Sequence, residues 1–69
     1  MYLNLLAEMT RKGCSKGDMA KYLGIAYNTF WAKMNGITDF NITEIKIICK
    51  FFDKPFEYLF EEMQAEKTA

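Results

Sequence analysis

Residues 15–36 read SKGDMAKYLGIAYNTFWAKMNG, a run in which start and stop signals for helices alternate. Ser15 is a favoured N-cap residue, and Asp18 three positions later comes close to a capping-box arrangement. Gly24 follows as a stop signal, because glycine readily takes the left-handed conformation that ends helices. These signals predict a short helix over residues 16–23.

The second half of this stretch predicts another short helix over residues 27–34. Phe30 and Met34 are four positions apart and mark its buried face. Asn35 and Gly36 end it, because both residues tolerate a positive φ. Two short helices joined by a turn that contains glycine form the helix-turn-helix motif, whose second helix enters the major groove of DNA.

Other helices are predicted on both sides of this unit. One covers residues 2–12, where Leu5 and Met9 share a face. After the unit, Asn41 and Glu44 repeat the capping signature at the start of a longer helix. The inward positions of this helix recur with the helical period and are Ile42, Ile45, Ile48, Cys49 and Phe52.

Pro55 suits the first turn of a fifth helix, which is predicted at about residues 56–62. Its apolar members are Phe56, Leu59 and Phe60. No strand signal competes, so the expected fold class is all-α with five short helices. We expect one domain over residues 1–63 and a polar, frayed C-terminal tail over residues 64–69.

The run AKYLGIAYNTF, residues 20–30, resembles the motif of the lambda-repressor-like domains, the Cro and phage-repressor type of helix-turn-helix. Asn35-Gly36 closes the unit as in that family, and the later runs ICKFF and YLF are similar to its fourth and fifth helices. The resemblance covers about residues 3–61. It implies a sequence-specific transcriptional regulator of phage or prophage type, a Cro-like minimal repressor that binds a double-stranded DNA operator.

The resemblance also implies roles for individual residues. Lys16 would touch a DNA phosphate, and Asn35 would meet the backbone again. Base edges would face Tyr27, Asn28 and Thr29 at the start of the recognition helix. Further along, on or near the DNA side, would lie Trp31, Ala32 and Lys33.

The chemistry of these side chains agrees with several of the implied roles. Asn28 is the expected main reader, because asparagine makes a bidentate pair with adenine. Thr29 can contact a base or a thymine methyl, and Ala32 only the methyl. Lys16 and Lys33 supply point charges for phosphates.

Two aromatic residues of the recognition helix leave alternatives open. Trp31 belongs to a residue type usually found in a core or an interface, yet it points about 100° away from Phe30. An exposed Trp31 would contact DNA or a partner. Tyr27 either faces DNA or packs against the preceding helix.

Two departures from the family pattern matter. Many members pair an Arg in the first helix with a Glu at the end of the third, and those positions are Met9 and Met34 here. We expect a packing contact in place of the ion pair. The second departure is charge: nine basic and nine acidic residues cancel, which counts against tight binding to phosphates. The basic residues gather in the first half and the acidic residues towards the end, so the molecule could still orient on DNA.

Apolar residues exceed what five short helices can bury, and exposed apolar patches tend to mark partner sites. The expected homodimer surface lies on the fourth and fifth helices and includes Phe51, Phe56 and Tyr58. The alternative is that these aromatic residues complete a small core.

Composition argues against an enzyme. The chain has no histidine and two cysteines, and it has no glycine loop suited to phosphate. We therefore expect no cofactor, no metal site and no small-molecule ligand. Cys14 and Cys49 are expected to be reduced core thiols, which suits the cytoplasm. No apolar stretch is long enough for a membrane span, and the N-terminus does not read as a signal peptide.

A second function remains open, a protein-interaction module that keeps the fold without DNA binding, such as an antirepressor or an assembly partner. The neutral charge, Trp31 and the apolar surplus favour it. The polar start of the recognition helix and the placement of Lys16 favour the DNA-binding regulator.

Overall fold

The computed structural model describes residues 1–61, which form five helices and no strand. The helices are α1 (Leu3–Lys12), α2 (Lys16–Leu23), α3 (Tyr27–Met34), α4 (Ile42–Phe52) and α5 (Phe56–Leu59). The predicted all-α fold class with five helices is confirmed. The last two residues of the predicted domain and the predicted tail at 64–69 lie outside the described residues.

Both predicted capping signatures form complete capping boxes. The Ser15 hydroxyl accepts from the Asp18 backbone N–H, and the Asp18 carboxylate accepts from the Ser15 N–H, each at 3.0 Å. Asn41 and Glu44 make the same reciprocal pair at the start of α4, at 2.8 and 3.0 Å. These local bonds explain why α2 and α4 begin where the sequence predicted.

Gly24 ends α2 in the left-handed conformation, with φ of 74°. Its N–H donates to the Lys21 carbonyl at 3.1 Å, and the Ile25 N–H donates to the Ala20 carbonyl at 2.9 Å. This pattern closes the helix C-terminus and turns the chain within three residues into α3. The turn fixes the relation between the two helices.

The prediction for α5 was too long, because the helix ends at Leu59. Phe60 takes φ of −107° and ψ of 20° and leaves the helix. Its ring packs against the rings of Tyr2 at 5.4 Å and of Phe40 and Phe56 at 5.3 Å each. No local stop signal in the sequence marks the end of α5. The helix ends where Phe60 makes these aromatic contacts with distant segments.

The core joins all five helices and the segment before α4. Its fully buried members include Met9 and Met34, consistent with packing at the two positions that the resemblance singled out. The ten buried apolar residues are Leu5, Met9, Met19, Ala20, Phe30, Met34, Phe40, Ile48, Phe52 and Leu59. Phe40 was not expected there, because it lies in a connecting segment without helical periodicity.

One predicted inward residue of α4 is exposed. Ile42 keeps 67% of its surface accessible, whereas Ile48 is fully buried. Ile48 is six positions after Ile42, so the two side chains point about 120° apart around the helix. Ile45 and Cys49 are half-buried at the edge of the core.

Candidate nucleic-acid interface

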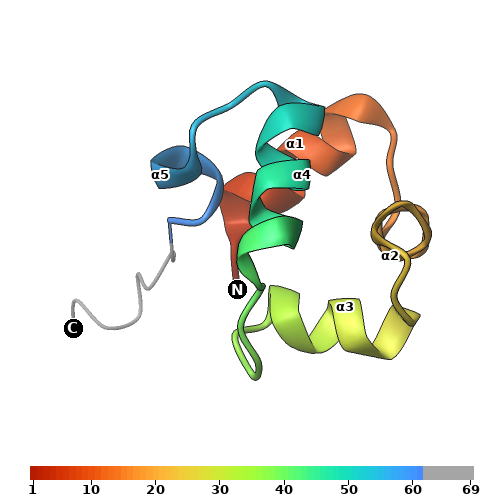
Figure 1. Cartoon of the computed structure of the whole chain (residues 1–69). Helices are drawn as coiled ribbons and strands as arrows, with labels where there is room; N and C mark the ends of the chain where they lie inside the picture. The colour runs from red at the N-terminus through yellow and green to blue at the C-terminus, as the bar shows by residue number, and fades with distance from the viewer. Residues whose placement is uncertain (62–69) are drawn as a thin grey trace, which may run out of the picture.

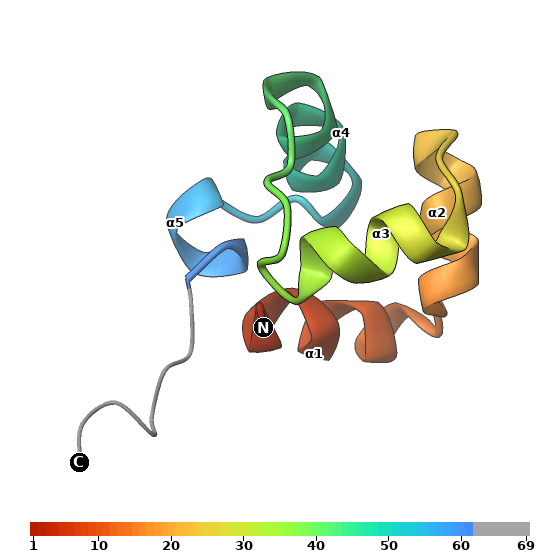
Figure 2. The same cartoon turned by 90° about the horizontal axis from the view of Figure 1, so that it is seen from below.

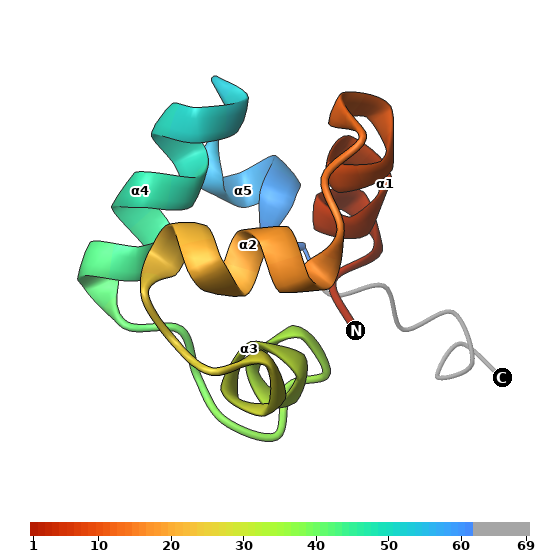
Figure 3. The same cartoon turned by 90° about the vertical axis from the view of Figure 1, so that its right-hand side faces the viewer.

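Helix α3 lies along one face of the molecule. In Figures 1 and 3 no other helix of residues 1–61 lies beneath it, and Figure 2 looks onto this face. Phe30 and Met34, both fully buried, anchor α3 to the core. The opposite side of α3 is therefore not covered by another helix, and the segment that follows α3 passes below it in Figure 3.

The open side carries most of the residues predicted to face DNA. Tyr27 is 51% exposed and Trp31 is 44% exposed, so neither is a core residue. Asn28 and Thr29 are exposed. Within residues 1–61, neither of these two side chains is hydrogen-bonded to the protein, so both are available to a ligand.

Lys33 is placed differently from its predicted role. Its ammonium nitrogen donates to both carboxylate oxygens of Glu44, at 2.6 and 2.8 Å, and the side chain is only 13% exposed. The charge is thus directed at α4 and neutralised within the protein. This pair removes Lys33 from the set of expected phosphate contacts. In the sequence, Glu44 was interpreted only as a capping residue of α4, so its ion pair with Lys33 was not predicted.

The other two predicted residues of this region sit at the end of α3. Ala32 is half-buried, and its carbonyl accepts from the Ile37 N–H at 2.9 Å. Asn35 is half-buried, and its side-chain amide donates to the Trp31 carbonyl at 2.9 Å. Both residues therefore help to close the helix.

The predicted basic half is partly neutralised in the fold. Arg11 pairs with the buried Glu8 at 2.8 Å, and Lys12 lies over an aromatic ring of α4 at 5.3 Å. Within residues 1–61, Lys16 and Lys21 form no ion pair. Lys16 is the first residue of α2 and is half-buried. It is the predicted phosphate contact whose charge remains free.

The segment after α3 presents apolar groups that sequence reasoning missed. Ile37 and Ile42 are exposed to 66% and 67%, and the exposed Asp39 lies between them in sequence. Ile37 lies in a connecting segment without helical periodicity, whereas Ile42 is the first residue of α4 and was predicted to point inward. The side chains of the connecting segment offer no cation to a DNA backbone.

The three residues predicted to form a dimer surface contact different parts of the molecule. Phe51 is half-buried against Tyr22, with ring centroids 4.7 Å apart. The Tyr58 hydroxyl donates to Glu8 at 2.9 Å. Phe56 alone is strongly exposed, at 50%. Phe51, Phe56 and Tyr58 therefore do not form one continuous surface patch.

Phe56 instead lines a surface groove of about 290 Å³ between the segment before α4, α4 itself and the end of the described chain. Its walls are formed by Tyr2, Asp39, Phe40, Ile45, Phe56 and Phe60. The groove is mostly apolar, with one carboxylate at Asp39.

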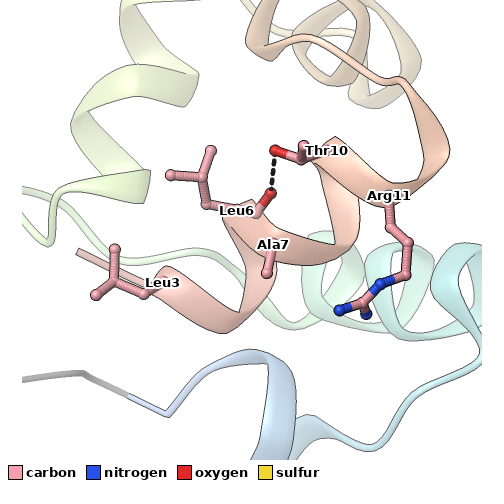
Figure 4. Close-up of a pocket in the computed structure, with 5 residues that line it drawn as sticks. All are labelled: Leu3, Leu6, Ala7, Thr10 and Arg11. Carbon is pink, nitrogen blue, oxygen red and sulfur yellow. Dashed lines mark hydrogen bonds between the residues drawn. The ribbon is translucent and has the colours of Figure 1, made fainter.

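A second hollow of about 510 Å³ lies on the outer side of α1 and is shown in Figure 4. One helix supplies its lining: Leu3, Leu6, Ala7, Thr10 and Arg11. The Thr10 hydroxyl donates back to the Leu6 carbonyl at 3.0 Å. None of the predicted site residues lies here.

Cys14 and Cys49 are free thiols, half-buried and packed against the core rather than inside it. Burial raises the pKa of both thiols, which keeps them protonated near neutral pH. In the described part of the chain, no three histidine, cysteine or carboxylate side chains come together around a metal position. None of the five helices has the length and apolar character of a membrane span.

Comparison with known proteins gives no match to a family model, to a curated protein or to a solved structure. The features of the molecule that indicate a function are the arrangement of α2, the turn and α3, and the side chains that α3 exposes.

Proposed function

We propose that this chain is a lambda-repressor-like helix-turn-helix protein that binds double-stranded DNA and acts in the cytoplasm as a Cro-like transcriptional repressor. The observation that carries the proposal is the pairing of α2 and α3 across the three-residue turn that begins at Gly24. The first turn of α3 exposes Asn28 and Thr29, side chains that read base edges.

The dimensions of α3 suit this role. An α-helix with its side chains is about 10–12 Å in diameter, and the major groove is about 12 Å wide. The buried side chains of Phe30 and Met34 attach α3 to the core, so the opposite side of the helix can enter the groove while α3 stays packed. The first turn of α3 then meets the bases, as in other proteins of this motif.

Lys16 supports the same orientation. It is the first residue of α2, and the free backbone N–H groups of a helix N-terminus favour an anion. A phosphate placed there would meet the Lys16 ammonium group, which forms no ion pair within residues 1–61, and would also lie near the Asp18 carboxylate of the capping box. One phosphate contact at α2 would set the register of α3 on the duplex.

We further propose that the chain acts as a homodimer through the groove that Phe56 lines. A two-fold dimer would present two α3 helices to successive turns of one face of the duplex. The exposed ring of Phe56, stacked on Phe60 at 5.3 Å, gives the groove an apolar rim suited to a second copy.

A protein partner on the α3 face is the second candidate function. The observation that favours it is the exposed apolar set formed by Trp31, Ile37 and Ile42, together with the zero net charge. Phosphate contacts dominate affinity for DNA, and this face offers few cations. As an antirepressor or an assembly partner, the chain would bind another protein through the same side chains.

Selection from a pool of random duplexes, at low and at physiological salt, separates the two functions. An enriched short palindrome supports the dimeric regulator, and the spacing of its half-sites gives the dimer geometry. Salt-dependent binding without an enriched sequence contradicts sequence-specific reading. An absence of binding at low salt contradicts the DNA proposal and leaves the protein partner.

A further inference from the structure

We infer that the half-site read by α3 consists mainly of A·T pairs, recognised by an asparagine–adenine pair and by apolar contacts with thymine methyl groups. This inference rests on the proposed DNA-binding function. It follows from the side chains that α3 exposes, and from the pairing of its one basic residue, Lys33, with Glu44.

A guanine contact lacks its usual cationic donor. Guanine presents two acceptors in the major groove, and arginine or lysine is the usual partner of both. Residues 27–34 contain a single basic residue, Lys33. Its ammonium group already donates to both oxygens of Glu44, at 2.6 and 2.8 Å, on the side of α3 that packs against the protein.

A cytosine contact lacks its usual carboxylate acceptor. Cytosine presents its amino group in the major groove, and aspartate or glutamate accepts from it. Residues 27–34 contain no acidic residue. The nearby Glu44 is buried, and its carboxylate is shared by Lys33 and by the Asn41 N–H.

The side chains that remain fit adenine and thymine. Asn28 offers one acceptor and two donors, the set that pairs with N6 and N7 of adenine. Thr29 presents a methyl group as well as a hydroxyl. Tyr27 and Trp31 are one helical turn apart, so their exposed rings lie on the same side of α3. They supply the apolar surface that thymine methyls require.

Two random duplex libraries with identical flanks test the inference, one with a core of A·T pairs and one with a core of G·C pairs. We expect selection from the A·T library to yield duplexes bound about tenfold or more tightly than those from the G·C library. Equal or tighter binding of the G·C duplexes would overturn the inference while leaving DNA binding intact. No binding to either library at low salt would overturn the proposed function itself.

Replacing thymine by uracil in the best duplex then tests the mode of reading. This change removes only the 5-methyl group in the major groove, so a preference that depends on minor-groove width would survive it. We expect a several-fold loss of affinity, and an unchanged affinity would contradict methyl contacts.

An Asn28→Arg variant provides a second test on an exposed position that can change without disturbing the core. Arginine brings the donors that guanine requires. We expect this variant to shift its preference towards the G·C library. A preference that stays with A·T in the variant would show that α3 does not set it.

Discussion

The Glu44 carboxylate links the end of α3 to the start of α4. Its two oxygens lie 2.6 and 2.8 Å from the Lys33 ammonium nitrogen, and one of them also accepts from the Asn41 N–H at 3.0 Å. One side chain thus completes the cap of α4 and fixes the last turn of α3. Among the ion pairs of residues 1–61, the one between Lys33 and Glu44 joins α3 to another helix.

A Glu44→Gln substitution separates the two roles of this residue. Glutamine still completes a capping box, so α4 should begin at the same residue. The ion pair is lost, and we expect unfolding to become easier by about 1–2 kcal/mol. Urea denaturation followed by circular dichroism measures this change.

A double-mutant cycle with Lys33→Met provides the control. If the two groups act on each other, the double variant should lose less stability than the sum of the single variants, by about 1 kcal/mol. Additive losses would contradict a direct link between α3 and α4.

The limits of the helices were predictable because their signals are local. The capping boxes at Ser15 and Asn41, and the left-handed Gly24, each depend on residues within one turn. The contact between Lys33 and Glu44 spans eleven positions and depends on how α3 meets α4. No local pattern could reveal it.

The candidate site was predictable to a similar degree. Helical periodicity placed Phe30 inward and left Asn28 and Thr29 on the exposed face. The dimer surface was predicted less well. Phe51 contacts Tyr22 of α2, and Tyr58 donates a hydrogen bond to Glu8 of α1. Both contacts depend on how the five helices pack, which the sequence pattern does not reveal.

Charging the core at Met9 and Met34 tests the departure from the family pattern. Each side chain is fully buried, so Met9→Arg or Met34→Glu alone would bury an unpaired charge and cost about 3–5 kcal/mol. The double variant can form an ion pair and should be more stable than either single variant. Thermal melts of the three proteins make the comparison, and a double variant less stable than both single variants would refute the expectation.

Tyr58 joins α5 to α1 through its hydrogen bond to Glu8 at 2.9 Å. This bond, with burial and the Glu8 charge, raises the pKa of the Tyr58 hydroxyl. The folded state favours the neutral Tyr58 hydroxyl. The stabilisation that its hydrogen bond provides is therefore fully present below the ordinary tyrosine pKa of about 10. It is lost as the pH rises through the raised value.

A Tyr58→Phe variant should therefore have a lower Tm at pH 7. It should also show a smaller loss of Tm between neutral and strongly alkaline pH than the unchanged protein. Thermal melts across that range provide the measurement. Parallel pH profiles for the two proteins would show that the bond is not linked to stability.

Lys16 should contribute one phosphate contact per chain. Because each neutralised phosphate releases counterions, Lys16→Ala should reduce the slope of log K against log salt by about 1. Lys50→Ala is the matched control, since this exposed lysine lies in the last turn of α4, the end that Figure 1 places away from α3. Equal changes for the two variants would mean that binding has no defined orientation.

The most direct test of base reading by α3 compares binding to the selected duplex and to a scrambled duplex of the same composition. The proteins compared are the unchanged chain, Asn28→Ala and Thr10→Ala, the last altering an exposed residue on the outer side of α1. We predict that Asn28→Ala loses most of the discrimination between the two duplexes, whereas Thr10→Ala keeps it. Full discrimination retained by Asn28→Ala would contradict the account.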